Sequence, residues 1–255
     1  MRPLVMGVLN VTPDSFSDGG RWSDPGAAVE RGLEMAAQGA DIVDVGGEST
    51  RPGAEPVSEQ VERARVVGVV RSLAPHVRVS VDTRRRSVAE AAVEAGATMV
   101  NDVSATLWPV AAEAGVAWVA MHMKGEPRTM QESPVYGDVA REVRLFLVER
   151  AAAAQAGGVK EVWVDPGIGF GKTLAHNLEV LGRLGELVAE GFPVVVGTSR
   201  KSFIGHLTGG APPDDRLEGS VATAVWAMTR GAAMVRAHDI PATVEAARLV
   251  AGAAA

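Results

Sequence analysis

Polar side chains that could take part in chemistry follow eight short apolar runs of the chain. The carboxylates and amides among them can accept paired hydrogen bonds from a planar edge that carries N–H beside NH₂. The cation among them can bind an anionic group. The set therefore indicates a site that binds a nitrogen-rich heterocycle at one side and an anion at the other. The residues that end the eight runs are Asn10, Glu48, Asp82, Asn101, His122, Asp165, Ser199 and Arg236.

The acceptor part of the site is predicted from Asp82, Asn101 and Asp165. Each has a structural alternative. Asp82 could pair with one of the three arginines at 84–86, and Asn101 could cap the following turn together with Asp102. Three such residues at the ends of neighbouring runs favour one binding arc over independent structural roles.

Asp165 opens the run DPGIGFGKT (165–173), which looks like a nucleotide-binding P-loop. A P-loop requires glycine five residues before its Gly-Lys pair, and position 166 is proline here. The run is therefore interpreted as a rigid glycine-rich turn that presents Asp165, and the case for a nucleotide triphosphatase is lost.

The cationic part is predicted from two runs, GTSRKSFIG (197–205) and VRAHD (235–239). In TIM barrels the loops after strands seven and eight often bind phosphate. For His238, a neutral core histidine bonded to backbone is the alternative. The residues expected to meet the anion are Ser199, Lys201, Ser202, Arg236 and His238.

A metal site built by the protein alone is not indicated. The chain contains no cysteine, and His122 has no second histidine or acid at the spacing of a zinc motif. Mg²⁺ carried by substrate phosphates is favoured instead, because this ion prefers oxygen ligands and keeps several waters.

The runs that position these residues repeat one phrase, in which an Ala-rich stretch ends in glycine and an apolar run follows, as in GADIVDVGGE (39–48). Apolar runs without alternation are typical of strands buried on both faces of a parallel sheet. Eight such units predict a single (β/α)₈ TIM barrel over residues 1–255, with the site at the carboxyl ends of the strands. Long loops are predicted after strands 1, 2 and 5, at 10–22, 46–58 and 123–136.

Helices are predicted between the strands. One is expected to open with a capping box of Ser87 and Glu90 and to close before Gly96. The leucines between 178 and 188 follow the spacing of one core-facing stripe. The other expected helices span 25–38, 138–156, 217–228 and 244–250.

The formal net charge of −6 over 255 residues argues against a nucleic-acid surface, which requires an excess of basic residues. It leaves room for an anionic small substrate, because local cations matter more than the total. No apolar run approaches the ~20 residues of a membrane span, and the first residues lack the pattern of a secretory signal. We therefore expect a cytoplasmic protein without nucleic-acid or membrane partners.

Eight motifs, in their order and spacing, resemble those of the dihydropteroate synthase family. The resemblance covers nearly the whole chain. It implies a transferase of folate biosynthesis that condenses 6-hydroxymethyl-7,8-dihydropterin diphosphate with 4-aminobenzoate and releases diphosphate by a dissociative displacement at the pterin methylene. The motifs are NVTPDSFSDGG (10–20), GGESTRPG (46–53), SVDT (80–83), NDVS (101–104), MHMKGEP (121–127), DPGIGFGKT with HN at 176–177, SRKSFIG (199–205) and RAHD (236–239).

Carried over motif by motif, the resemblance implies a role for each site residue. Asn10 would touch Mg²⁺, the implied cofactor, as well as diphosphate. The pterin edge would meet Asp82, Asn101, Asp165 and Lys201, and diphosphate would also meet Arg236 and His238.

The second substrate and the catalytic set are implied in the same way, and the family also implies a homodimer that sulfonamides target. 4-Aminobenzoate would meet Thr50, Arg51, Pro52 and Ser202, with Phe16 and Asp18 closing from the first loop. The catalytic residues would be Asp18, Asp82, Lys201, Arg236 and His238.

Three other readings stay open. A pterin-binding methyltransferase barrel would share the Asp/Asn/Asp pocket, but it has no use for the anion-binding motifs or the STRPG run. A non-catalytic pterin-binding paralogue would show losses in the first two loops, and the motifs there are intact. A sugar-phosphate barrel fits the acceptor arc poorly.

Overall fold

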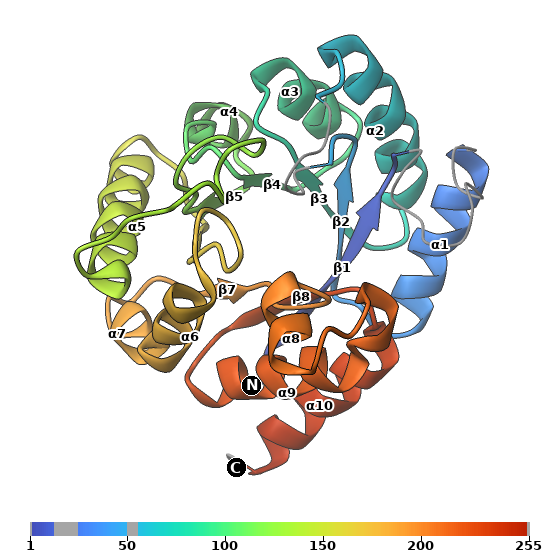
Figure 1. Ribbon diagram of the computed structural model, residues 1–255. Coiled ribbons are helices and arrows are strands. Elements are labelled where there is room, and N and C mark those ends of the chain that lie inside the picture. Colours follow the sequence, from blue (N-terminus) through green and yellow to red (C-terminus); the bar gives the residue numbers. More distant parts are fainter. Residues whose placement is uncertain (1, 13–24, 50–55, 254–255) are drawn as a thin grey trace.

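The computed structural model describes residues 2–12, 25–49 and 56–253, which form eight parallel strands arranged as a barrel inside a ring of helices (Figure 1). Neighbouring strands follow the order β6-β5-β4-β3-β2-β1-β8-β7. A parallel bridge between Val164 and Val194 joins β6 to the segment before β7 and brings the two ends of the sheet together. The predicted (β/α)₈ barrel is confirmed. The strands are β1 Leu4–Asn10, β2 Ile42–Gly46, β3 Arg78–Asp82, β4 Met99–Asp102, β5 Ala117–Met121, β6 Val162–Asp165, β7 Val195–Val196 and β8 Met234–Ala237.

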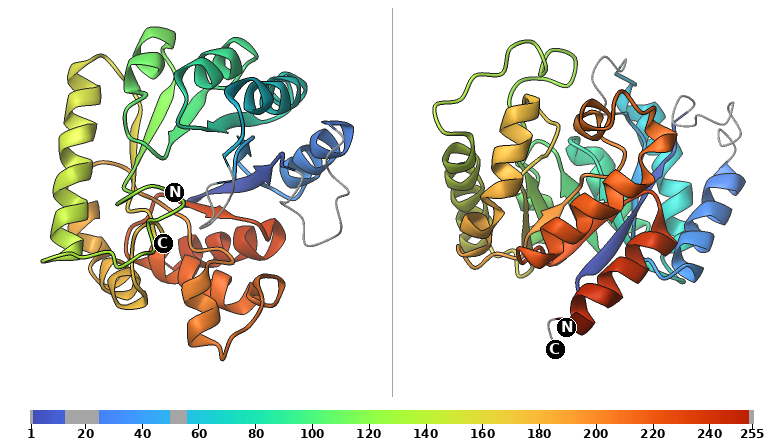
Figure 2. Two further views of the ribbon diagram at one scale, coloured as in Figure 1. Left: turned by 45° about the horizontal axis from the view of Figure 1, so that its top comes forward. Right: turned by 60° about the horizontal axis from the view of Figure 1, so that its bottom comes forward.

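Helices cover the outer face of the strands, as Figure 2 shows from two directions. None of the helices within the described ranges is long and apolar enough to cross a membrane. The helices are α1 Pro25–Ala37, α2 Glu59–Leu73, α3 Arg86–Glu94, α4 Trp108–Ala114, α5 Val139–Ala156, α6 Leu174–Gly182, α7 Leu184–Val188, α8 Ser202–Leu207, α9 Leu217–Thr229 and α10 Ile240–Ala253, with a 3₁₀ turn at Pro213–Asp215.

Two of the helix predictions are wrong. The helix α3 begins at Arg86 without a side-chain cap, and Ser87 donates its hydroxyl to Glu59 on α2 instead of capping α3. Packing between the two helices thus takes the place of the local capping box. The leucine stripe is divided, because the chain breaks at Arg183 between α6 and α7, and Leu178 is exposed.

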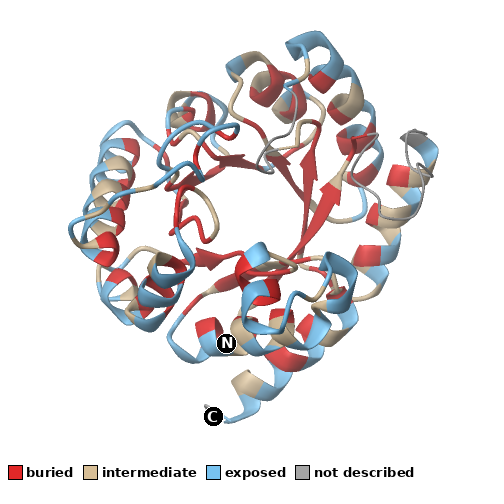
Figure 3. Ribbon diagram, in the orientation of Figure 1, coloured by how far each residue is buried: buried red, intermediate tan, exposed pale blue. Residues whose placement is uncertain are grey.

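The apolar core has two parts, which Figure 3 shows as buried residues on the strands and on the inner sides of the helices. The larger part fills the layer between strands and helices. The smaller part consists of Met6, Ile42, Met99, Ala117, Val119, Trp163, Val195 and Met234 from the strands. We assign it to the barrel interior, because a TIM barrel is filled by strand side chains.

The alternation of strand side chains places polar residues above this interior layer. Side chains two residues apart on a strand point to the same face. Each of four polar residues follows an interior apolar residue by two positions, and therefore faces the barrel axis one layer nearer the carboxyl end. These four are Asp44 after Ile42, Asn101 after Met99, Asp165 after Trp163 and Arg236 after Met234.

Candidate active site at the barrel mouth

Arg236 on β8 lies at the centre of the polar layer. Its Nε donates to Asp44 Oδ2 at 2.6 Å and one Nη donates to Asp82 Oδ2 at 2.8 Å. Its other terminal nitrogen, Nη1, has no hydrogen-bond partner among residues 2–12, 25–49 and 56–253. Burial disfavours the charged guanidinium, yet Asp44 and Asp82 raise the pKa of Arg236 above its ordinary value. Arg236 is therefore a fixed cation with one side open to a ligand.

Opposing effects act on the pKa of the Asp82 carboxyl. Burial raises its pKa to about 7, although the Arg236 guanidinium opposes the rise, and the nearby Asp44 adds to it. The predicted alternative, that Asp82 pairs with an arginine at 84–86, is wrong, because its partner is Arg236. Strand pairing places Asp82 beside Asn101 on β4 and beside Gly46 on β2. Two of the three residues predicted to form one arc, Asp82 and Asn101, are therefore neighbours.

Asp44 is not among the residues to which the sequence pattern points. Its side chain is fully buried, and Oδ2 accepts from Asn101 Nδ2 at 2.9 Å as well as from Arg236. Asp44 lies inside the apolar run IVDVG, so the pattern points instead to Glu48, the polar residue after the run, as the contribution of this strand. An isolated carboxylate within an apolar run is the signal that could have identified it, since buried charges require partners.

Asn101 and Asp102 divide the two roles that the sequence left open for them. Asn101 faces inward and bonds to Asp44. Asp102 faces outward, and its carboxylate accepts from the backbone N–H groups of Ser104, Thr106 and Leu107. The capping alternative therefore holds for Asp102 and is wrong for Asn101.

Asp165 and Lys201 approach the mouth from β6 and from the loop after β7. Asp165 Oδ1 accepts from the Gly167 backbone N–H at 2.7 Å, and burial raises the pKa of Asp165 against the opposing charge of Lys201. Lys201 Nζ donates to the Ile168 carbonyl and lies 4.7 Å from the centre of the Phe170 ring. Burial lowers the pKa of Lys201 to about 8, and Asp165 opposes that shift.

Ser199, Ser202 and His238 complete the predicted anion-binding set with different outcomes. Ser199 Oγ lies 3.0 Å from His238 Nδ1 and accepts from the His238 backbone N–H at 3.2 Å. The histidine is half-buried and contacts a side chain, so it does not lie in the core as the alternative would have it. Ser202 is the first residue of α8 and is exposed.

Asn10 ends β1 at the same level as Asp82. A Cβ at Gly46, between the two, would lie 3.5 Å from Asn10 Oδ1 and 3.8 Å from Asp82 Oδ2. The absent side chain thus leaves room between an amide oxygen and a carboxylate oxygen. Across the described ranges, His, Cys, Asp and Glu form no group of three that could hold a metal ion. These donors fit a Mg²⁺ ion that arrives with substrate oxygens.

Two of the residues that end predicted strands lie away from Arg236. Glu48 is bound by Arg84 and Arg85 at 3.5 and 3.3 Å. His122 is buried behind the loop after β6, where its Nδ1 lies 3.0 Å from Lys172 Nζ. Five further site residues, Phe16, Asp18, Thr50, Arg51 and Pro52, lie outside the described residues.

Comparison with known proteins identifies the family. A family model described as pterin binding enzyme matches residues 6–238. The dihydropteroate synthase of Mycobacterium leprae is 48% identical, over 96% of this chain and 92% of that protein. The chain belongs to the dihydropteroate synthase family. Like its family, it is a pterin-binding transferase of folate biosynthesis.

Solved structures of dihydropteroate synthases share the fold in detail. The Yersinia pestis enzyme in complex with a sulfonamide drug superimposes with a TM-score of 0.94 at 44% identity, covering 99% of this chain and 94% of that one. The Xanthomonas albilineans enzyme with 4-aminobenzoic acid gives a TM-score of 0.92 at 46% identity, covering 100% and 94%.

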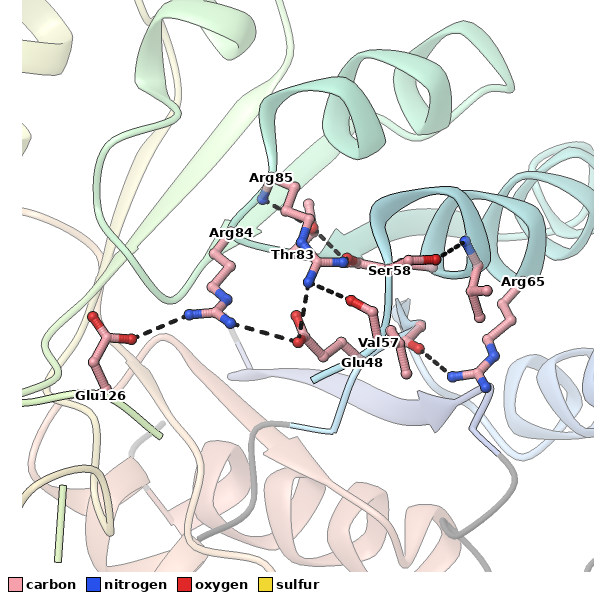
Figure 4. Close-up of polar contacts among 11 residues, drawn as sticks. Glu48, Val57, Ser58, Arg65, Thr83, Arg84, Arg85 and Glu126 are labelled. Atoms are coloured by element: carbon pink, nitrogen blue, oxygen red, sulfur yellow. Dashed lines mark hydrogen bonds and ion pairs between the residues drawn. The ribbon is translucent and has the colours of Figure 1, made fainter. Parts of the chain in front are cut away.

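A polar network fixes the rim of this dihydropteroate synthase barrel beside the mouth (Figure 4). Arg85 donates to Glu62 at 2.7 Å, to Glu48 at 3.3 Å and to the Val57 carbonyl at 2.6 Å, so one guanidinium contacts the described residues on both sides of 50–55. Arg84 contacts Glu48 and, at 3.2 Å, Glu126 of the connection after β5. This rim, formed by Glu48, Glu62, Arg84, Arg85 and Glu126, ties three connections of the mouth to one another.

Proposed function

We propose that the mouth of the barrel binds the pterin diphosphate and 4-aminobenzoate and catalyses their condensation through the residues described above. The observation that carries this proposal is the position of Arg236, which is held by the carboxylates of Asp44 and Asp82 while its Nη1 has no hydrogen-bond partner among the described residues. One side of the pocket offers acceptors for a heterocycle, and the other offers cations for a leaving anion.

The pterin edge meets Asp82, Asn101, Asp165 and Lys201. Asn101 gives its amide nitrogen to Asp44 and keeps its oxygen as an acceptor for the ligand. Asp165 uses one lone pair for the Gly167 N–H and keeps its second oxygen. A carboxylate has acceptor sites for several donors, so Asp165 can also bind the N–H and NH₂ groups of the ring.

The diphosphate meets Arg236, His238 and Asn10. Arg236 Nη1 supplies a fixed positive charge, and the contact of Ser199 with His238 Nδ1 holds the imidazole ring in place. Mg²⁺, bound through Asn10 and the oxygens of the diphosphate, would neutralise part of the negative charge that develops on the leaving group.

4-Aminobenzoate binds through Ser202 and, by the family resemblance, through Thr50, Arg51 and Pro52. The resemblance also assigns Phe16 and Asp18 to this substrate. The 4-aminobenzoic acid bound to the Xanthomonas albilineans relative supports this assignment, and the complex of the Yersinia pestis relative supports sulfonamides as competitors for the same place.

The reaction follows from this arrangement. The bond between the pterin methylene and oxygen breaks with its electron pair going to diphosphate, where fixed cations lower the barrier most. The ring cation that remains is stabilised by the carboxylate of Asp82 and, by the family resemblance, by that of Asp18. The neutral amine of 4-aminobenzoate then forms the new C–N bond and loses a proton to solvent. An aniline nitrogen is nucleophilic when neutral, so no general base is required.

Release of diphosphate, measured with and without 4-aminobenzoate and Mg²⁺, tests the proposal. We expect release to require all components and to yield 7,8-dihydropteroate in equal amount. A rate of diphosphate release that is the same with and without 4-aminobenzoate would refute the condensation. We further propose a cytoplasmic homodimer, and a monomer mass in sedimentation equilibrium would contradict it.

A further inference from the structure

The lysine of the false P-loop motif points back into the protein. Lys172 is 2% exposed, so it is buried where a P-loop lysine would face phosphate. Its Nζ lies 2.9 Å from the Gly167 carbonyl and 3.1 Å from the Phe170 carbonyl, both in its own loop. It also contacts His122, at 3.0 Å to Nδ1 and 3.4 Å to the carbonyl. The imidazole can accept this bond, since burial lowers the pKa of His122 to about 3 and keeps it neutral.

The loop at 166–171 contains neither helix nor strand. One backbone bond closes its turn, from the Phe170 N–H to the Gly167 carbonyl at 3.0 Å, and side chains provide the other contacts. Backbone polar groups that leave water must find partners. Lys172 satisfies two of its carbonyls, and Lys201 takes a third, at Ile168. Gln131 donates to the Gly169 carbonyl at 2.6 Å and Tyr136 to the Gly171 carbonyl at 2.7 Å, both from the connection after β5.

The loop also packs directly on the backbone that follows β5. A Cβ at Gly167 would lie 1.9 Å from the His122 carbonyl oxygen, and one at Gly171 would lie 2.1 Å from the Lys124 carbonyl oxygen. Both glycines have positive φ, at 64° and 60°. The loop at 166–171 and the segment after β5 therefore approach too closely for a side chain at either glycine. Lys172 contacts both backbones, at the carbonyls of Gly167 and His122.

The 166–171 loop contacts two residues of the proposed pterin pocket, Asp165 and Lys201. Gly167 accepts a hydrogen bond from Lys172 through its carbonyl and donates its own N–H to Asp165. The Phe170 carbonyl accepts from Lys172, and the Phe170 ring lies beside Lys201. Lys201 also donates to the carbonyl of Ile168 in the same loop. A loss of the Lys172 bonds would release both contacts together.

We propose that Lys172 is a positioning residue for the pterin side of the pocket: by binding carbonyls of the 166–171 loop and of His122, it sets the places of Asp165 and Lys201. The inference rests on the proposed roles of those two residues in pterin binding. It concerns pterin more than 4-aminobenzoate, because the contacts that Lys172 fixes lead to the acceptor arc.

The test is Lys172→Met, which keeps an unbranched side chain one atom shorter and removes its donors. We expect the Kd for 6-hydroxymethylpterin and the KM for the pterin diphosphate to rise together by about tenfold or more, since small displacements of binding groups have large effects. The KM for 4-aminobenzoate should change by less than about twofold. Lys160→Met is the matched control, because Lys160 is exposed.

Two results would overturn the inference. One is an unchanged Kd for 6-hydroxymethylpterin in a folded Lys172→Met protein, and the other is an equal rise of both KM values, which indicates general loosening. If the wild-type protein does not bind 6-hydroxymethylpterin, the proposed function itself is refuted. Circular dichroism and the Tm establish that each variant is folded.

Restoring the amino group provides a second measurement if the methionine variant does not fold. The chain has no cysteine, so in Lys172→Cys a thiol-directed reagent acts at one position only. Alkylation with 2-bromoethylamine in denaturant, followed by refolding, places an amino group at the lysine distance. We expect this protein to recover the Kd of the wild type, whereas the same protein alkylated with iodoethane, which adds no donor, should not. Equal affinities of the two alkylated proteins would refute the role of the amino group.

Discussion

Arg236 Nε on β8 lies 2.6 Å from Asp44 Oδ2 on β2, across the interior of the barrel and 192 residues away in sequence. The strand β1 separates their two strands in the sheet. The same guanidinium reaches Asp82 on β3. One cation thus joins three strands of the mouth at the level where the substrates are proposed to bind.

Asp44→Asn should weaken this arrangement. The substitution keeps the shape of the side chain but removes the charge that faces Arg236, and breaking a buried ion pair costs about 3 kcal/mol or more. We expect the free energy of unfolding in urea to fall by about that amount and pterin affinity to fall with it. Glu113→Gln is the control, because Glu113 pairs with Arg86 at the surface, where the loss should stay below about 1 kcal/mol. Equal stability losses in the two variants would contradict the proposed importance of the interior pair.

Gly167→Ala should be far more destabilising than Gly158→Ala. Both glycines have positive φ, at 64° and 99°, so both substitutions carry the backbone cost of the left-handed region. Only at Gly167 does the new Cβ meet an atom, the His122 carbonyl oxygen at 1.9 Å, whereas nothing lies within 4 Å at Gly158. We expect about 1 kcal/mol for Gly158→Ala and more than about 3 kcal/mol for Gly167→Ala, measured by urea unfolding. Similar losses at the two sites would show that the loop can move away from β5.

Arg85→Met should destabilise the protein where Arg86→Met does not. Arg85 contacts Glu62, whose side chain is fully buried and would lose its cation. Burial already raises the pKa of Glu62, against the effects of Thr83 and Arg85. Arg86 pairs with exposed Glu90 at the surface. We expect losses of about 3 kcal/mol and less than about 1 kcal/mol, respectively, from thermal and urea unfolding. Recovery of the lost stability in Arg85→Met with Glu62→Leu would confirm that the unpaired carboxylate is the cause.

Lys172→Met should change the dependence of stability on pH. Burial lowers the pKa of Lys172 to about 7 from 10.5, with Asp165 opposing the shift and Lys201 adding to it. Between pH 7 and 10.5, Lys172 is protonated in the unfolded chain and largely neutral in the folded protein. The free energy of unfolding of the wild type therefore rises with pH over this range. The neutral His122 and the cation of Lys124 also face this region.

The measurable quantity is the difference in unfolding free energy between the wild type and Lys172→Met. We expect it to grow in favour of the wild type by up to about 1.4 kcal/mol per pH unit from pH 7 to 10. Shifts of Lys201 and of the acids cancel in the difference to the extent that they are common to both proteins. A difference that stays constant over this range would contradict the lowered pKa.

The repeated phrase of the chain was enough to predict the barrel and the inward-facing acids Asp82 and Asp165. A buried parallel strand has a run of apolar residues that can be recognised without its partners. Side-chain alternation then fixes which polar residue near the strand end faces the axis. The same local logic predicted the helix at 138–156, which the structure has as α5, and the Asp138 side chain caps it.

Contacts between distant segments required the tertiary structure. No local pattern marks Asp44, because its partners stand 57 and 192 positions away. No local pattern shows that Glu48 pairs with arginines of another loop either. The capping box at Ser87 failed when Glu59 of the neighbouring helix offered a competing acceptor.

The amino-acid sequence by itself determined the eight strands, the family and most of the residues that line the mouth, because each of these leaves a pattern within a few residues. Only the closed barrel decided that Arg236 joins Asp44 to Asp82 and that Lys172 faces inward. The energy of a buried charge depends on which groups surround it, and the ring of strands brings those groups together from segments that share no local pattern.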